Sequence, residues 1–221
     1  MSKKDEVIRL LETCSDAERK EVFQYLRKTN SIHKIEDDLG TRAEVILEAI
    51  NRANDITLRG IRGIITELAF LNEVINKLKG WNNILFSGDL AYDFLIEDAS
   101  GRVNIQVKMQ RTLKGLPLEG PTGKWVAETQ RTRTGKNKAG QATRPYQFGE
   151  FDILAVSLQP STRDWSKFMY TVGNWLLPRP NDSNLLKVMQ PVAKVPNDDW
   201  TDDLNVCINW FRSNTTKTIT P

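Results

Sequence analysis

AYDFLIEDASGRVNIQVKMQR, residues 91–111, reads as two β-strands joined by a tight turn. Residues 98–101 (DASG) supply turn-forming side chains and end in glycine. If these four residues form the loop, Glu97 faces Arg102 across the hairpin. An opposite-charge pair at that place supports this register over its neighbours.

The same register places chemistry on one face of the hairpin. Asp93 lies directly opposite Gln106, and Lys108 shares the face of Gln106 because strand side chains alternate. The other face receives apolar residues, namely Phe94, Ile96, Ile105 and Val107. A shift of one residue would scatter the polar group, so its existence depends on the register. An ordinary hairpin with a solvent-facing polar stripe is the plain alternative.

Helices and strands surround the hairpin. Residues 57–80 carry apolar side chains at helical spacing and end in glycine, which predicts a helix. Glu67 lies beside that apolar stripe, where it either serves a site or points to solvent. Three strands, 83–86, 91–97 and 102–109, then precede a buried strand at 151–158, a strand at 167–172 and a helix at 203–212. This order predicts an α/β fold whose central mixed sheet is flanked by helices.

The first 55 residues predict a separate helical unit, with residues 56–221 forming the α/β domain. Ser15 with Glu18, and Thr41 with Glu44, are capping-box pairs that begin helices. Two short helices meeting at a glycine turn are typical of a helix-turn-helix, in which Arg42 would face DNA. A helical hairpin that packs on the rest of the protein also explains the pattern, and the acids on that exposed face, which phosphates would repel, favour it.

Composition excludes several classes of protein. The chain has 221 residues, a net charge of +3, two cysteines (Cys14 and Cys207) and one histidine (His33). These are too few ligands for a zinc site and too few groups for Ser/His/Asp hydrolysis. The sequence contains no glycine-rich phosphate-binding motif, so we expect no nucleotide cofactor. With no membrane span, no apolar leader and few cysteines, we expect a reduced, cytoplasmic protein with no membrane partner.

Positive charge is concentrated in one segment. Residues 111–144 contain 8 Lys/Arg and 2 Asp/Glu, whereas residues 1–55 contain 10 and 12. Such a concentration suits a polyanion-binding surface, although a solvated basic loop is also possible. We interpret residues 111–149 as a long insertion leaving the end of the hairpin, where DNA would lie. The candidate DNA contacts there are Gln110, Arg111, Lys114, Gln130, Arg131, Arg133, Lys136, Lys138 and Arg144.

An acid, an amide and an amine on one sheet face suit metal-assisted hydrolysis of phosphodiesters. A carboxylate such as Asp93 can hold Mg²⁺, and Gln106 can add a carbonyl oxygen. The metal lowers the pKa of a bound water and neutralises charge on the phosphoryl oxygens. An ammonium such as Lys108 can orient that water and stabilise the transition state.

Asp93 followed by Gln106-Val107-Lys108 resembles the PD-(D/E)XK nuclease superfamily, which includes most type II restriction endonucleases. The likeness covers roughly residues 57–160 and implies a restriction-endonuclease-like core. It implies catalytic roles for Asp93, Gln106, Lys108 and Glu67. It also implies that Asp93, Glu67, Gln106 and the Val107 carbonyl bind the metal. Gln106 departs from the family pattern, which has Asp or Glu there, and removes a negative charge.

The resemblance implies a Mg²⁺-dependent, sequence-specific endonuclease of double-stranded DNA, with Mn²⁺ as a substitute metal and a homodimer as the active form. Two alternatives remain open. One is a non-catalytic DNA-binding protein on a degenerate nuclease core, and the other is a repair or recombination nuclease of the same fold. Substitution of Asp93 by alanine separates the first alternative from a nuclease.

Overall fold

The structure is a computed structural model that describes residues 2–28, 30–88, 90–130 and 145–221. It divides into two compact units, Met1–Leu58 and Arg59–Pro221, and the sequence predicted a division after residue 55. In the described part of the chain, no helix is long and apolar enough to cross a membrane.

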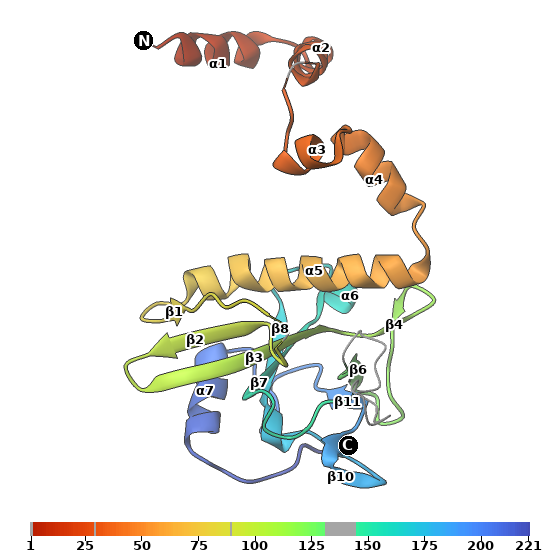
Figure 1. The fold of residues 1–221 in the computed structure, drawn as a ribbon, viewed down its shortest axis with the longest axis vertical. Coiled ribbons are helices and arrows are strands. Elements are labelled where there is room, and N and C mark those ends of the chain that lie inside the picture. Colours follow the sequence, from red (N-terminus) through yellow and green to blue (C-terminus); the bar gives the residue numbers. More distant parts are fainter. Residues whose placement is uncertain (1, 29, 89, 131–144) are drawn as a thin grey trace. The chain divides into compact units, whose positions relative to one another are not determined.

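The N-terminal unit is helical. Ser15 and Glu18 form the predicted capping box at the start of its second helix. Two short helices then meet at Gly40, whose φ of 61° is left-handed and therefore favours glycine. The helices are α1 (Lys3–Thr13), α2 (Asp16–Arg27), α3 (Lys34–Leu39) and α4 (Ala43–Asn51), coloured red to orange in Figure 1.

The predicted capping box of Thr41 with Glu44 is wrong. Helix α4 begins at Ala43 without a side-chain cap. A carboxylate from α3 takes over, because Glu36 accepts a hydrogen bond of 2.6 Å from the Ala43 N–H. Glu44 is bound instead by Arg27 of α2, at 2.9 Å. A tertiary contact therefore replaces the local cap.

A mixed sheet of five strands forms the centre of the C-terminal unit, in the order β1-β2-β3-β7-β8. All neighbours are antiparallel except β3 and β7, which are parallel. The strands are β1 (Asn82–Asn83), β2 (Phe94–Asp98), β3 (Gly101–Met109), β7 (Ile153–Ser157) and β8 (Phe168–Val172). This confirms the predicted α/β class with mixed strand directions.

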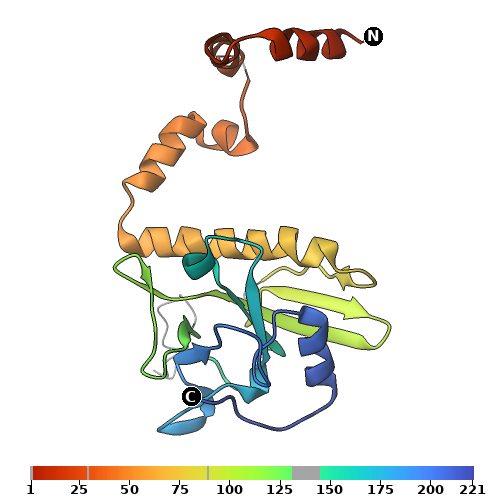
Figure 2. The ribbon, with the colours of Figure 1, turned by 180° about the vertical axis from the view of Figure 1, so that it is seen from behind.

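Helices flank this sheet, as Figures 1 and 2 show. Helix α5 (Asp55–Glu73) ends earlier than predicted and is followed by a 3-10 turn, Ile75–Lys77. Helix α7 (Leu204–Arg212) buries Cys207 and Ile208. The short helix α6 (Gln159–Thr162) follows β7, and a second 3-10 turn, Gly173–Trp175, follows β8.

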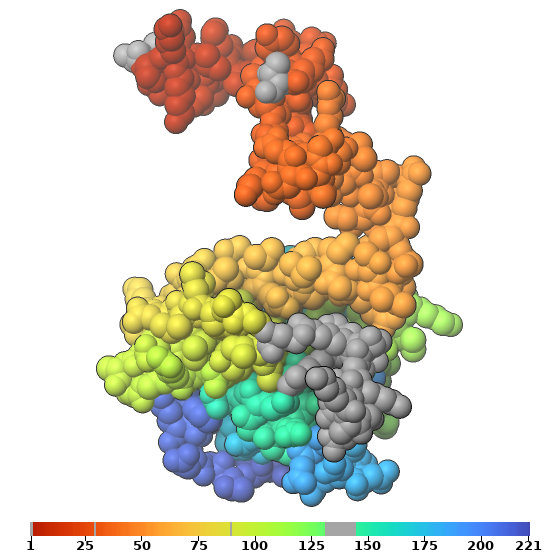
Figure 3. Space-filling view, viewed as in Figure 1, coloured from red at the N-terminus to blue at the C-terminus, as the bar shows by residue number. Residues whose placement is uncertain are grey.

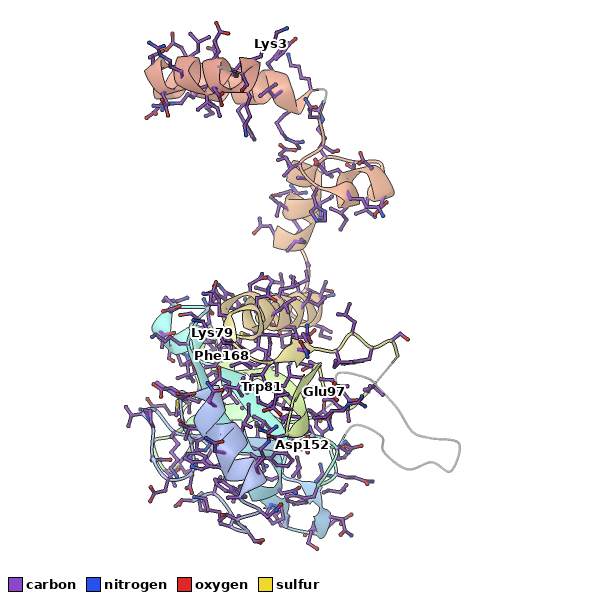
Figure 4. The ribbon with its side chains drawn as sticks, turned by 90° about the vertical axis from the view of Figure 1, so that its left-hand side faces the viewer. Lys3, Lys79, Trp81, Glu97, Asp152 and Phe168 are labelled. Atoms are coloured by element: carbon purple, nitrogen blue, oxygen red, sulfur yellow. The ribbon has the colours of Figure 1, made fainter. Side chains whose placement is uncertain are left out.

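Phe70 anchors α5 to the sheet. Its fully buried ring lies 5.2 Å from the ring of Phe94 and 5.1 Å from that of Phe168, centroid to centroid. Figure 4 shows Asp152 and Phe168 toward opposite ends of the paired strands β7 and β8. Asp152 ties the start of β7 to β3, since its Oδ2 accepts a hydrogen bond of 2.8 Å from the Asn104 N–H.

The C-terminal end of α7 contacts the tip of the hairpin formed by β2 and β3. Arg212 donates two hydrogen bonds to the carboxylate of Asp98, and its guanidinium lies 5.0 Å from the ring of Trp81. Figure 3 shows the yellow-green hairpin and the blue α7 side by side on this face. Charge pairing and cation–π contact together hold the hairpin against the helix.

The predicted long loop after β3 is partly wrong. Its described residues contain a small hairpin and a strand that pairs with a distant segment. The additional strands are β4 (Thr112–Leu113), β5 (Leu116–Pro117), β6 (Trp125–Glu128), β9 (Pro178–Arg179), β10 (Asp182–Leu186) and β11 (Met189–Val192). Because β6 pairs with β11, more than 60 residues away, local sequence gave little sign of it.

Candidate active site

The hairpin has the predicted register. Glu97 pairs with Arg102 in the strand ladder, and their side chains form an ion pair of 3.0 Å. Asp93 immediately precedes the ladder, where its N–H donates to the Ile105 carbonyl at 3.0 Å. Asp93 is thereby opposite Gln106, as the loop at residues 98–101 required.

Backbone and side chain both hold the Asp93 carboxylate. Its Oδ2 accepts hydrogen bonds from the Val107 N–H at 2.8 Å and from Gln106 Nε2 at 2.5 Å. Burial raises the pKa of Asp93, while the charge of Lys108 and the Val107 hydrogen bond act to lower it. The carboxylate is therefore fixed in place but costly to keep charged, a state that a nearby cation would relieve.

Gln106 is almost completely buried, with 2% of its surface exposed. Besides the bond to Asp93, its Nε2 donates to the Val107 carbonyl at 3.2 Å. Its Oε1 accepts a hydrogen bond of 3.2 Å from the hydroxyl of Tyr146. The amide thus lies between two oxygen atoms on one side and a tyrosine on the other.

Lys108 extends from the same face of β3. The charge of its ammonium acts on the carboxyls of both Asp93 and Glu67. Its Nζ also lies 5.5 Å from the centroid of the Tyr146 ring, within the range of a cation–π contact. A half-buried lysine beside two acids can act on an anion brought to the same place.

Glu67 on α5 completes the group. It is half-buried, and burial raises its pKa first, followed by the negative charge of Asp93. Lys108 acts in the opposite direction. These mutual effects indicate that Glu67 lies within electrostatic reach of Asp93 and Lys108, and its role in a site stays a prediction.

The site offers oxygen ligands of the kind that Mg²⁺ prefers. The oxygen atoms come from the carboxylates of Asp93 and Glu67, the amide of Gln106 and the carbonyl of Val107. Within the described residues, no group of three or more His, Cys, Asp or Glu side chains lies close enough to hold a metal. A cation here would depend on two acids and neutral oxygens, which fits Mg²⁺ with retained waters better than a softer metal.

Gln110 does not have the predicted surface role. It is fully buried, its N–H donates to the Ser157 carbonyl at 2.9 Å, and its Oε1 accepts from the Ser161 N–H at 3.2 Å. A side chain enclosed by β6, β7 and α6 cannot contact DNA in this conformation. The prediction is wrong because it treated the residue after β3 as the start of an exposed loop.

Other candidate DNA contacts are placed in different ways. Arg111 forms an ion pair with Glu128, and Gln130 also donates to Glu128. Lys114 is exposed in the turn between β4 and β5, and Arg42 is exposed at the start of α4. Arg131, Arg133, Lys136, Lys138 and Arg144 lie outside the described residues. DNA contact by these residues stays a prediction.

Tyr146 is the site residue that the sequence analysis missed. It lies in the segment read as a loop, yet only 4% of it is exposed, and its ring meets Phe151 edge-on at 5.4 Å. The spacing of Tyr146, Phe148 and Phe151 just before a buried strand is the available signal. It marks core packing but does not reveal the contact with Gln106.

No protein-family model and no curated protein matches the chain. Among solved structures, the fold is similar to "The structure of a bacterial homing endonuclease: I-Ssp6803I", with a TM-score of 0.36 and 23% sequence identity. The match covers 55% of this chain and 71% of that chain.

Proposed function

We propose that this chain is a Mg²⁺-dependent endonuclease that hydrolyses phosphodiester bonds of double-stranded DNA at a specific sequence. The observation that supports this most is the convergence of Asp93, Gln106 and Lys108 at one end of the hairpin, with Glu67 approaching from α5. Burial disfavours the charged forms of both acids, so the site gains from a bound cation.

Asp93, Glu67, and the carbonyl oxygens of Gln106 and Val107 would hold Mg²⁺, with Mn²⁺ as a substitute. The bound ion supplies an activated water and neutralises charge on the phosphate. Asp93 is already oriented for this role by the Val107 N–H, which does not depend on a flexible side chain. Such preorganisation lowers the cost of assembling the site.

Lys108 would act on the phosphate. Its ammonium shares the sheet face of Gln106, and the ring of Tyr146 lies beside it. In a half-buried position an ammonium can orient a water and stabilise the negative charge that develops on phosphoryl oxygens. Removal of one such electrostatic donor typically costs about 10²–10³ in rate.

The basic segment after β3 would bind the DNA backbone and read bases. Its described cations include the exposed Lys114, while Arg111 is engaged by Glu128. We expect a homodimer to cut both strands at one site, because two-fold symmetric DNA matches a two-fold symmetric protein.

A non-catalytic DNA-binding protein is the second candidate. Gln106 favours it, because an amide in place of an acid leaves two carboxylates in the group. Two acids suffice for a Mg²⁺ site that retains several waters, which is why we place the nuclease first. A repair or recombination nuclease would use the same residues but would not cut DNA at one specific sequence.

Incubation of the purified protein with plasmid or phage DNA, with Mg²⁺ or with EDTA, tests the proposal. We expect discrete fragments that require the metal and disappear in Lys108→Ala. Lys77→Ala is the matched control, since Lys77 is exposed and paired with Glu73, the last residue of α5. Smearing would favour a nuclease without sequence specificity. A salt-sensitive gel shift without cleavage by Mg²⁺ or Mn²⁺ would instead favour the binding protein.

A further inference from the structure

The amide of Gln106 faces the acid with its nitrogen. Nε2 donates to both Asp93 Oδ2 and the Val107 carbonyl, at 2.5 and 3.2 Å. These are two of the oxygen atoms proposed above to hold a cation. The amide N–H groups therefore satisfy the same oxygens that a metal would satisfy.

The negative charge of Asp93 favours this orientation of the Gln106 amide as long as no cation lies between them. The opposite orientation would press the amide oxygen against the carboxylate of Asp93, and two acceptors repel each other. A bound cation reverses the requirement, because it takes oxygen ligands and an amide N–H repels it. Gln106 can contribute to the metal site only after its amide turns over.

Tyr146 is placed to serve both orientations. Its hydroxyl now donates to Gln106 Oε1 at 3.2 Å, and a phenolic hydroxyl can accept as well as donate. After the amide turns, the hydroxyl can accept from Nε2. The ring itself is held by burial and by the edge contact with Phe151, so it stays in reach.

We propose that the Gln106 amide is a reversible stand-in for the cation, and that Tyr146 is the positioning residue that allows the amide to turn over. This inference rests on the proposed function, since it concerns the same metal site. It assigns a purpose to the amide: the site keeps its oxygens hydrogen-bonded before the metal binds, at the expense of metal affinity.

A double-mutant cycle tests this idea by NMR titration with Mg²⁺. The four proteins are the wild type, Tyr146→Phe, Gln106→Glu and the double variant, and the signal followed in all is the backbone N–H of Val107. In Tyr146→Phe, a turned amide leaves a buried N–H without its acceptor, which costs more than an unsatisfied carbonyl. We expect the Mg²⁺ midpoint to rise about fivefold, the equivalent of roughly 1 kcal/mol for one hydrogen bond.

In the Gln106→Glu background the same tyrosine substitution should change the midpoint less than about twofold, because a carboxylate presents oxygen in either orientation. Gln106→Glu alone should lower the midpoint, since it adds negative charge to the site. In the wild type, the side-chain amide signals of Gln106, assigned by their loss in Gln106→Glu, should shift together with the Val107 signal. Tyr170→Phe, a substitution of the buried tyrosine of β8, is the control and should leave the midpoint unchanged.

Equal effects of Tyr146→Phe in both backgrounds, or Gln106 amide signals that do not move with Mg²⁺, would overturn the inference. DNA cleavage by the wild type is measured in the same buffers. If the wild type cleaves DNA but its Gln106 amide signals do not shift with Mg²⁺, the proposed nuclease function is retained and only the role of the amide is rejected. Absence of both cleavage and any Mg²⁺-dependent signal would remove the proposed function as well.

Discussion

The backbone N–H of Val107 donates a hydrogen bond of 2.8 Å to Oδ2 of Asp93, so the second strand of the hairpin orients the acid at the start of the first. The last residue pair between the two strands is Phe94 with Ile105, and Asp93 comes just before it in the chain. The acid therefore uses a backbone donor that the ladder leaves available. Its position depends on the register of the hairpin more than on neighbouring side chains.

Asp93→Ala should abolish cleavage while DNA binding is retained. The substitution removes a carboxylate that we propose as a metal ligand, and a loss of roughly 100-fold or more is expected, since even residues that only support metal ligands cost about 10–100-fold. Single-turnover cleavage and a gel shift measure the two properties. Glu97→Ala is the control, because Glu97 lies on the same strand and pairs with Arg102. Unchanged cleavage in Asp93→Ala would contradict the site.

Mg²⁺ binding should weaken on mild acidification, at a pH above the usual titration range of carboxyls. Burial raises the pKa of both Asp93 and Glu67, so protons compete with the metal earlier than at an exposed acid. The raised pKa values affect folding stability with the opposite sign, so acidification stabilises the fold through these two groups while it weakens Mg²⁺ binding. A carboxyl whose pKa is raised in the folded state favours folding below its unfolded-state pKa, and this contribution is lost as the pH rises through its folded-state pKa. Mg²⁺ titrations across mildly acidic to neutral pH measure the first effect; a midpoint independent of pH throughout that range would contradict it.

The hairpin and its register could be predicted because their causes are local. A four-residue turn and the charges of Glu97 and Arg102 are enough to define the pairing that places Asp93 opposite Gln106. The central mixed sheet followed from alternation and buried runs in the sequence. Here local propensity, charge and pattern agree, which is the condition under which sequence reasoning succeeds.

Long-range contacts explain what the sequence did not reveal. Gln110 is buried by elements that arrive from distant parts of the chain, and its bond to Ser161 has no local signature. Tyr146 meets Gln106 across 40 residues. At the start of α4, Glu36 displaces Thr41 as the capping partner because Arg27 holds Glu36 and Glu44 together. In each case tertiary contact overrides a local rule.

The N-terminal unit should unfold in acid through Glu36. The hydrogen bond from Arg27, followed by that from the Ala43 N–H, lowers the pKa of Glu36 from 4.5 to about 2. A depressed folded-state pKa contributes stability above the unfolded value, and that stability is lost as the pH falls through the folded one. We therefore expect NMR signals of α2 to α4 to change between pH 4.5 and about 2.

Two glutamate variants separate this effect from general acid unfolding. Glu36→Gln should destabilise the unit at neutral pH and reduce its pH dependence in that window, because one of the two carboxylates that pair with half-buried Arg27 is gone. Glu48→Gln, whose exposed side chain pairs with Arg52, should behave like the wild type. If both variants titrate alike, Glu36 is not the responsible group.

Phe70→Ala should lower the free energy of unfolding of the C-terminal unit by about 3–5 kcal/mol, the usual cost of deleting a buried aromatic ring. The ring is fully buried and contacts Phe94, Phe168 and Tyr170, so its loss leaves a cavity between α5 and the sheet. Leu68→Ala on the same helix is the control, because that side chain is 53% exposed and should change stability by less than about 1 kcal/mol. Urea unfolding followed by tryptophan fluorescence measures both. Equal losses in the two variants would show that Phe70 does not hold α5 to the sheet. Because Glu67 lies on α5, a loosened α5 in Phe70→Ala should also weaken Mg²⁺ binding.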